Sequence, residues 1–291
     1  MKHVFVSPHP DDIALSCGGL VALLTDRGES VTIVTVFSGP GTLPRLTPYQ
    51  RLALGFGSRH RASAAQDEAA LRAEAAESLA AVAAAPTPAE VMAARRAEDA
   101  AYARSVGAAI VFVDAPDAVF RDYYGDALMG PAREDDAPPV AALRHALARL
   151  SPERLYIPFS LGGHVDHRLA RRAACAIAPG HGPAAPLEAL FYEDFPYALA
   201  MGFEKTGQLD PDVMACLPEG ATLAPEYVEL RGFLSRKIDN LTAYGSQMDR
   251  LFGGRATMAA DVRRRAARVG VLGGVGPAER YWKIVPAPAG T

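Results

Sequence analysis

Cysteine is scarce in this chain of 291 residues, and neither sign of charge is in clear excess. The three cysteines, Cys17, Cys175 and Cys216, are widely separated, odd in number and never arranged as C-x-x-C. This spacing argues against a disulfide framework, and we expect a reducing, cytoplasmic setting. The formal net charge is −3, with Lys and Arg spread along the chain, so we expect no nucleic-acid partner.

Long apolar runs are also missing. No run approaches the roughly 20 residues that a membrane-spanning helix needs, so we expect no membrane span. The apolar stretch before Pro8 is too short for the core of a signal peptide. Hydrophobic residues still make up 49% of the chain, which is enough to bury a sizeable core. A chain of this length fits one α/β domain that carries insertions.

The first 37 residues alternate between strand and helix patterns. His3 to Val6 is a short apolar run closed by Ser-Pro, which predicts a buried strand. Ile13 to Arg27 is long enough for a helix, and Ser30 to Phe37 is rich in β-branched residues, which favours a second strand. A strand, a helix and a strand in this order predict a βαβ unit with parallel strands and a right-handed crossover.

The same alternation continues along the chain. Further helices are predicted at Pro88–Val106, Val140–Leu150, Asp166–Ala178 and Leu234–Tyr244, and further strands at Ala109–Val113, Arg154–Ile157, Ala189–Tyr192 and Tyr281–Val285. We expect a single α/β domain over residues 1–291, with a Rossmann-like, open, mainly parallel sheet flanked by helices. Residues 39–87 are predicted to form a loop or helical insertion, and residues 200–291 a C-terminal extension that completes the fold or the pocket.

Two short motifs rich in His and Asp occupy equivalent places in this pattern. HPDD, residues 9–12, follows the first predicted strand, and GGHVDH, residues 162–167, follows the fourth. Loops that leave the carboxyl ends of parallel strands lie on one edge of the sheet, where ligands bind. The two motifs can therefore meet in space. Either motif alone would more often be a solvated acidic turn, but their joint placement favours a site.

The residue types in these motifs suit a divalent metal. His9 and Asp12 are three residues apart at a turn into a helix and could face one point, which leaves Asp11 free. Two histidines and one aspartate make a plausible ligand set for Zn²⁺ with a position open for water. A free carboxylate beside that water could act as the general base of a hydrolase. Of His164 and His167, one could bind the metal and the other could hold or protonate the substrate.

The segments VSPHPDDIALSCGG and FSLGGHVDH resemble those of the LmbE-like, or PIG-L, metal-dependent de-N-acetylases. The similarity extends through RRAEDAAYARSVG and FVDAPD to about residue 195. The resemblance implies that His9, Asp12 and His167 bind the metal and that Asp11 is the general base. It also implies that His164 stabilises the oxyanion or protonates the leaving amine, with Asp166 as a carboxylate that orients an imidazole.

The resemblance implies a zinc-dependent hydrolase that removes an N-acetyl group from an amino sugar or a glycosylated small molecule. Fe²⁺ suits the same ligands. Two positions depart from the family pattern: Ile13 stands where many members carry Glu, and Gly162 stands where mycothiol deacetylases carry a tyrosine that assists the oxyanion. Either another group takes over the function of that tyrosine, or the function is weaker in this protein.

Candidate substrate-binding residues follow from the same resemblance. Arg95 resembles the arginine that contacts the sugar, although Arg95 and Glu98 could equally form a surface ion pair one helical turn apart. Asp114 or Asp117, after the third strand, could bind sugar hydroxyls or could simply form an acidic turn. Three aromatic residues of FYEDFPY, Tyr192, Phe195 and Tyr197, could wall a pocket or belong to the core.

Three other functions remain open on the sequence. The site could hydrolyse another amide or an ester of a natural-product intermediate, or the fold could bind a ligand without catalysis. A nucleotide-binding Rossmann module is disfavoured because HPDD, and not a G-x-G-x-x-G turn, follows the first strand. The expected partner is an N-acetylated sugar or glycoconjugate, and the insertion at 39–87 could contact a second copy of the chain.

Overall fold

A computed structural model describes residues 1–47, 49–50, 86–177, 187–200 and 211–286. Its centre is a seven-stranded sheet in the order β3-β2-β1-β4-β5-β7-β6. The pairs among the first five of these strands are parallel, and β7 pairs antiparallel with both β5 and β6. The predicted fold class, a mainly parallel α/β sheet in a single domain, is therefore confirmed.

The strands follow the predicted runs closely in the first two thirds of the chain. Their bounds are β1 Lys2–Ser7, β2 Ser30–Thr35, β3 Ala109–Phe112, β4 Arg154–Pro158, β5 Glu188–Tyr192, β6 Ala221–Glu229 and β7 Ala278–Pro286. Side chains alternate between the two faces, because successive residues of a strand point in opposite directions. Val4 and Val6 therefore join one hydrophobic cluster while Phe5, between them, joins the other.

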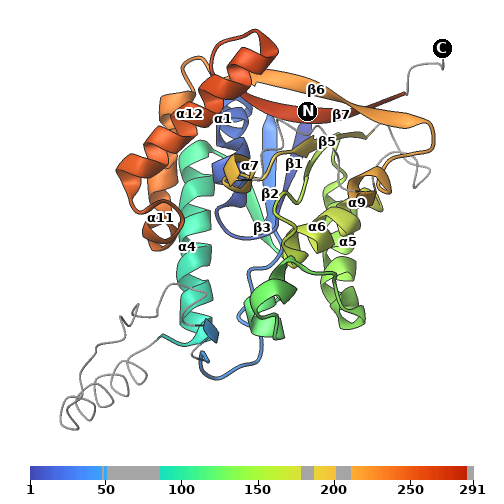
Figure 1. The fold of residues 1–291 in the computed structure, drawn as a ribbon, viewed down its shortest axis with the longest axis vertical. Coiled ribbons are helices and arrows are strands. Elements are labelled where there is room, and N and C mark those ends of the chain that lie inside the picture. The colour runs from blue at the N-terminus through green and yellow to red at the C-terminus, as the bar shows by residue number, and fades with distance from the viewer. Residues whose placement is uncertain (48, 51–85, 178–186, 201–210, 287–291) are drawn as a thin grey trace.

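Helices cover both faces of the sheet (Figure 1). The longer ones are α1 Asp12–Asp26, α4 Pro88–Val106, α5 Ala137–Leu150, α6 Val165–Cys175, α10 Leu234–Asn240, α11 Gly245–Phe252 and α12 Arg255–Gly273. Short turns of helix are α7 Tyr197–Ala200, α9 Pro211–Met214, η1 Ala118–Arg121, η2 Gly125–Met129, η3 Glu134–Asp136 and η4 Leu241–Ala243. One cluster packs α5 and α6 against the sheet, and the other packs α1, α4, α10, α11 and α12.

The sequence signals at the ends of α4 show why this helix matches its predicted range. Thr87 accepts a hydrogen bond from the backbone N of Glu90 at 3.2 Å, and the Glu90 carboxylate accepts one from the backbone N of Thr87 at 2.7 Å. This reciprocal pair caps the first turn, and Pro88 occupies the first helical position, where no amide hydrogen is needed. Gly107 ends the helix with a φ of 76°.

The C-terminal part differs most from the prediction. The sequence patterns did not predict β6, α11 or α12, and the last predicted strand, Tyr281–Val285, lies inside the longer β7. Pro225 lies within β6, which is the edge strand of the sheet, where the missing amide hydrogen of proline is tolerated. The predicted helix at Leu234–Tyr244 is found as α10 followed by η4. Most of the predicted insertion, residues 51–85, lies outside the described residues.

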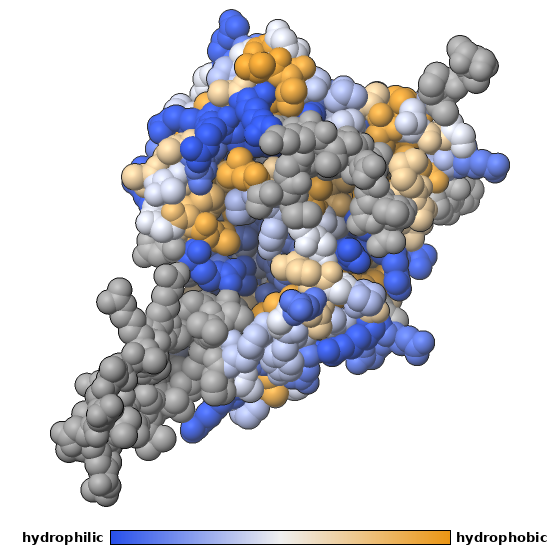
Figure 2. All heavy atoms as spheres, in the orientation of Figure 1, coloured by the Kyte–Doolittle hydropathy of each residue, from blue (hydrophilic) through white to orange (hydrophobic). Residues whose placement is uncertain are grey.

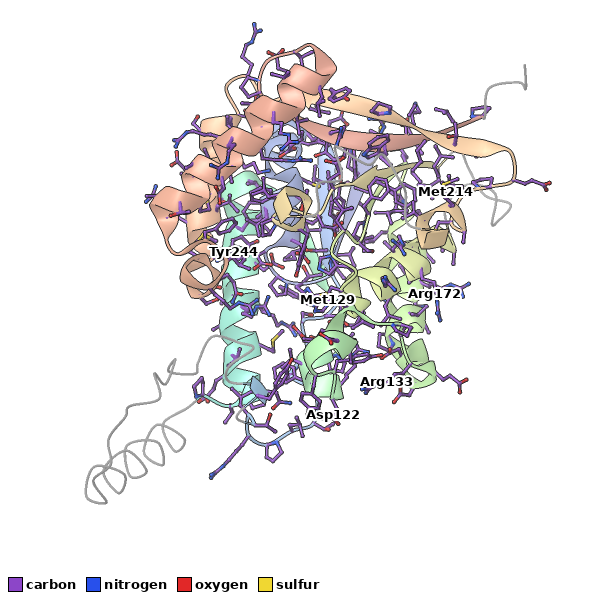
Figure 3. All side chains as sticks on the ribbon, viewed as in Figure 1. Asp122, Met129, Arg133, Arg172, Met214 and Tyr244 are labelled. Carbon is purple, nitrogen blue, oxygen red and sulfur yellow. The ribbon has the colours of Figure 1, made fainter. Side chains whose placement is uncertain are left out.

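The C-terminal part is also tied into the core. Tyr244, labelled in Figure 3, donates a hydrogen bond from its hydroxyl to Asp99 of α4 at 2.6 Å. The Asp99 carboxylate accepts a second hydrogen bond from Thr35, at the end of β2. Burial raises the pKa of Asp99 to about 6, even though both hydroxyls stabilise its charged form.

The outer surface is mixed in polarity. In the face shown in Figure 2, hydrophilic residues are interspersed with small groups of hydrophobic ones. Among the described residues, no helix combines the length and the apolar composition needed to cross a membrane.

Candidate active site

The two predicted motifs lie side by side at the carboxyl ends of β1 and β4. These strands are parallel neighbours, so the loops that follow them leave the same edge of the sheet. The ring centroid of His9 lies 5.0 Å from that of His164 and 5.3 Å from that of His167. All three histidines are buried. The chain topology therefore brings together side chains that are about 150 residues apart in the sequence.

The HPDD turn is held by short hydrogen bonds from neighbouring residues. Ser7 donates from its hydroxyl to the carbonyl of His9 at 2.7 Å, and Asp12 accepts from the backbone N of His9 at 2.8 Å. Asp11 caps helix α1 with a φ of 101°, in the left-handed region that side chains other than glycine seldom adopt. Backbone strain of this kind is typical of functional sites, where the surrounding contacts enforce it.

Three side-chain atoms converge on one point. His9, Asp12 and His167 each offer a ligand atom, and these atoms all lie within 4.8 Å of one another. Nδ1 of His9 lies 3.5 Å from Oδ2 of Asp12, and Nε2 of His167 lies 3.4 Å from the same oxygen. Nε2 of His167 is buried and has no hydrogen-bond partner among the described residues. A buried polar atom without a partner suits a metal ligand, and two imidazoles with one carboxylate suit Zn²⁺ or Fe²⁺.

The far nitrogens of two imidazoles are each fixed by a carboxylate. Nε2 of His9 lies 2.9 Å from Oδ2 of Asp166, and Nδ1 of His167 lies 2.6 Å from Oδ1 of Asp194. An ionised carboxylate only accepts hydrogen bonds, so each imidazole must donate there. The lone pairs of the neutral rings are then on Nδ1 of His9 and Nε2 of His167, the two atoms that face Asp12. This is the usual arrangement behind metal-binding histidines.

Asp194 is not among the site residues predicted from the sequence, although the sequence carries a signal for it. Glu193 and Asp194 directly follow β5, at the same edge of the sheet as the two motifs. The rule that paired HPDD with GGHVDH would have placed this acidic pair beside them.

A second group of ligand atoms, from His9, His164 and Asp166, is also close enough to hold a metal. Its carboxylate is already fully engaged, however. Asp166 accepts hydrogen bonds from Nε2 of His9, from the backbone N of Ala118 at 2.8 Å and from the Arg121 guanidinium. We therefore favour the group with the unpartnered nitrogen, that of His9, Asp12 and His167. Arg121 carries no sequence signal that points to this contact.

Carboxylates lie around both His9 and His167, so the site favours a positive charge. Burial is the largest single effect and would lower the pKa of His9, and the nearby charge of Asp117 is the main effect that opposes it. Hydrogen bonds to Asp12 and Asp166 add to this effect, and the pKa of His9 rises to about 10. Burial would raise the pKa of Asp12, yet His167 and His9 lower that pKa to about 2.

Asp11 has different neighbours from Asp12. Burial raises the pKa of Asp11 to about 7, against the opposing charge of Arg95. Arg95 is itself buried, donates to the carbonyl of Pro10 at 3.3 Å and lies 3.5 Å from Asp117. A buried carboxylate that titrates near neutrality can accept and release a proton during a reaction.

Arg95 does not form the surface ion pair with Glu98 that the sequence left open. Glu98 instead accepts hydrogen bonds from the backbone N and the hydroxyl of Ser246, at 2.8 Å and 2.6 Å. Arg95 thus supports the HPDD turn from the α4 side.

His164 is the N-cap residue of helix α6, and its side chain presents a defined ring nitrogen. Its Nδ1 accepts a hydrogen bond from the backbone N of Asp166 at 3.2 Å, so the neutral ring carries its proton on Nε2. Burial, followed by the positive charge of His9, lowers the pKa of His164 to about 4. A neutral imidazole of this kind can donate a hydrogen bond to an oxygen of the substrate.

The two candidate aspartates after β3 lie in different environments. Asp117 is buried, and its carboxylate lies 3.7 Å from Nε2 of His9. The side chain of Asp114 is 59% exposed and pairs with Arg96. The structure thus brings Asp117 into the buried cluster and leaves Asp114 at the surface.

Of the aromatic candidates, Tyr197 is the one next to the motifs. Its ring packs edge-on against His167, with the centroids 5.7 Å apart. A side chain at Gly162, where φ is 85°, would come within 2.7 Å of the Tyr197 ring. Tyr197 therefore fills the space beside Gly162. Tyr192 and Phe195 are buried within the core, as the alternative prediction held.

The sequence of the chain is similar to those of known de-N-acetylases. The family model described as PIG-L, GlcNAc-PI de-N-acetylase, matches residues 4–178. The chain is 32% identical to a 2′-N-acetylparomamine deacetylase of Streptomyces fradiae, over 99% of this chain and 91% of that protein. A 2′-N-acetylparomamine deacetylase of Niallia circulans is 27% identical over 67% of this chain and 66% of that protein.

The fold also resembles a solved structure. The zinc-inhibited form of teicoplanin deacetylase superposes with a TM-score of 0.73 at 20% sequence identity, and all of both chains is covered.

Proposed function

The chain belongs to the PIG-L family of de-N-acetylases, and we propose that it removes the N-acetyl group from an amino sugar within a glycosylated natural-product intermediate. One observation carries the proposal most directly: Nε2 of His167 is buried, has no hydrogen-bond partner within the described ranges, and faces Asp12 in a cluster with His9. Such a cluster suits the metal-dependent hydrolysis of an amide. The paromamine and teicoplanin deacetylases that resemble the chain support the substrate class.

His9, Asp12 and His167 would hold the metal, and we propose Zn²⁺ or Fe²⁺. When bound, the metal supplies Lewis acidity that activates water and polarises the amide carbonyl. Asp166 and Asp194 orient the two histidines through their far nitrogens. The similar teicoplanin deacetylase is a zinc-inhibited form, so activation and inhibition by zinc both need to be measured for this protein.

The remaining motif residues then divide the proton chemistry. Asp11 accepts a proton from the attacking water, because its carboxylate is buried beside the cluster without belonging to it. His164 donates from Nε2 to the oxygen that becomes negative as the tetrahedral intermediate forms. The proton held by Asp11 then passes to the departing amine, and the products are acetate and a free amino sugar.

The substrate contacts proposed from the sequence are Arg95 and Asp114. The proposed substrate contact of Arg95 is supported by its position next to the HPDD turn and Asp117. The proposed substrate contact of Asp114 is supported by the exposure of its side chain in the loop after β3. We also propose a cytoplasmic location, on the same ground of cysteine usage as before.

The proposal is tested with the metal-stripped protein, reloaded with one equivalent of Zn²⁺ or of Fe²⁺ under anaerobic conditions. 2′-N-acetylparomamine, N-acetylglucosamine and ester analogues are offered, and released acetate and primary amine are measured. We expect amine release from an N-acetylated amino sugar that a chelator abolishes. Activity that survives the chelator, or hydrolysis of esters alone, would overturn the proposal, and the latter outcome would favour the esterase alternative.

A further inference from the structure

The C-terminal part of the chain reaches the site through Glu193, the residue next to Asp194. The Glu193 carboxylate is buried and accepts hydrogen bonds from Nε of Arg280 at 2.7 Å and from Nε1 of Trp282 at 2.9 Å. The Arg265 guanidinium, from α12, forms an ion pair with the same carboxylate. These three partners all lie beyond residue 178, where the match to the family model ends.

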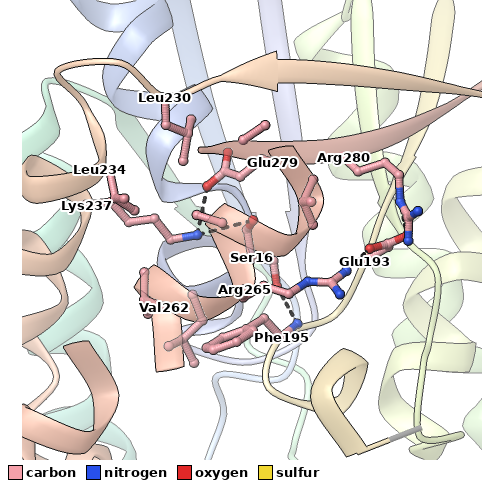
Figure 4. Close-up of a pocket in the computed structure, with 14 residues that line it drawn as sticks. Ser16, Glu193, Phe195, Leu230, Leu234, Lys237, Val262, Arg265, Glu279 and Arg280 are labelled. Carbon is pink, nitrogen blue, oxygen red and sulfur yellow. Dashed lines mark hydrogen bonds and ion pairs between the residues drawn. The ribbon is translucent and has the colours of Figure 1, made fainter. Parts of the chain in front are cut away.

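Figure 4 shows Glu193 beside Arg280, together with Arg265, in the pocket lined by residues of α1, α12 and β7. The side chains of Arg265 and Arg280 are only 12% and 6% exposed. Removing the carboxylate that pairs with buried guanidinium groups is strongly unfavourable, so the position of Glu193 is firmly held.

Asp194, the next residue along the chain, is held by contacts with His167 and Leu161. Asp194 contacts Nδ1 of His167 through one oxygen at 2.6 Å and accepts from the backbone N of Leu161 through the other at 3.0 Å. The backbone N of Phe195 donates to the hydroxyl of Ser16, on α1, at 3.0 Å. Asp194 therefore lies in a short segment that is anchored on both sides.

We propose that Glu193 is a positioning residue: its clamp by Arg265, Arg280 and Trp282 holds Asp194 against His167 and so keeps that imidazole aimed at the metal. The inference rests on the proposed metal site. A carboxylate that accepts a hydrogen bond from a metal-binding histidine fixes the orientation of the imidazole as well as its charge. A shift of the backbone that carries the carboxylate would therefore misalign this hydrogen bond. The C-terminal segment thereby becomes part of the support of the site.

The chain offers a matched control in the same pocket. Glu279 of β7 is also buried and ion-paired, with Lys237 at 2.7 Å, but it accepts from the backbone N of Gly19 and Leu20 and has no contact with Asp194 among the described residues. Glu279→Gln therefore disturbs a comparable buried ion pair of the C-terminal part without removing a group that contacts Glu193 or Asp194 among the described residues.

The experiment measures metal affinity in the absence of substrate. Metal-free wild type, Glu193→Gln, Glu279→Gln and Asp194→Asn are titrated with Zn²⁺ against a chromophoric chelator, and the folded fraction is taken from circular dichroism. We expect Asp194→Asn and Glu193→Gln each to weaken binding by about tenfold or more, as is usual when the partner of a metal-binding histidine is lost. Glu279→Gln should stay within about twofold of the wild type. The Co²⁺ absorption spectrum should change in Glu193→Gln and not in Glu279→Gln.

The double variant Glu193→Gln with Arg265→Gln separates positioning from folding. It removes one cation together with the carboxylate, so we expect thermal stability to recover in part while the metal affinity stays low. Wild-type affinity in Glu193→Gln or in the double variant would overturn the inference. If the wild type itself bound no metal, the proposed function would fail, whereas binding by the wild type with no effect at Glu193 would refute this inference alone.

Discussion

Replacing Asp11 with asparagine should remove catalysis while leaving the metal in place. Asp11 does not belong to the cluster of His9, Asp12 and His167, so the ligand atoms remain. Asparagine is the appropriate replacement because it tolerates the left-handed backbone region, where the φ of Asp11 is 101°, better than alanine does. A lost general base typically lowers the rate by about 10²–10⁴-fold. This corresponds to roughly 3–5 kcal/mol of transition-state stabilisation.

The same change should not destabilise the metal-free protein at alkaline pH. Burial raises the pKa of Asp11 to about 7, so its ionised form is disfavoured in the folded state. An acid with a raised pKa in the folded state costs stability above its unfolded pKa, and this cost grows as the pH rises towards the folded pKa. The neutral amide of asparagine avoids that cost. We therefore expect metal-free Asp11→Asn to be as stable as the wild type at pH 8, or more stable.

The assay compares acetate release with metal content for both proteins. The expected result is one equivalent of metal in each and a kcat at least about 100-fold lower in Asp11→Asn. A variant that kept more than a tenth of the wild-type rate would refute the assignment of Asp11 as the base. A variant that lost its metal would show that Asp11 is a ligand.

Further predictions concern the proposed metal ligand His167, the contact between Gly162 and Tyr197, and the buried hydrogen bond between Tyr244 and Asp99. His167→Gln should weaken Zn²⁺ binding by about 100-fold or more in a chelator competition, and retained affinity would refute its role as a ligand. Gly162→Ala should lower stability by about 1–3 kcal/mol in thermal unfolding, because its Cβ would meet the Tyr197 ring at a φ of 85°; an unchanged Tm would contradict this contact. Tyr244→Phe removes a donor to Asp99, so it should cost about 1–2 kcal/mol. Because burial raises the pKa of Asp99 to about 6, the cost should be larger at pH 8, where the carboxylate is charged, than at pH 5; equal losses would argue against a charged Asp99.

The parallel part of the sheet and its helices could be predicted from local sequence patterns, and the tertiary structure agrees with those patterns. The capped helix α4 and the apolar strand β1 each carry their signals within their own residues. The meeting of His9 with His167 followed from one rule about strand ends. β6 did not follow, because Pro225 is compatible with a strand only at a sheet edge, and the edge position is decided by the pairing with β7.

The contacts behind the proposed metal ligands were harder to predict for the same reason. Asp166 lies within a recognised motif, so its role could be expected from the resemblance. Arg121 and Arg265 reach their carboxylates from segments that no local pattern connects to the site. Such pairs depend on how elements distant in the sequence pack, and a single chain carries no signal for that.

The adjacent aspartates of HPDD illustrate how the backbone can separate two functions. A left-handed φ at a residue other than glycine costs on the order of 1–3 kcal/mol, and glycine at this position would avoid most of that cost. The side chain of Asp11 is nevertheless present and buried, and the charge of Arg95 opposes the rise of its pKa. The same turn lets Asp12 begin helix α1 and cap the backbone N of His9. The strained residue is thus the one whose carboxylate lies outside the group of His9, Asp12 and His167, which is the position that we propose for the general base.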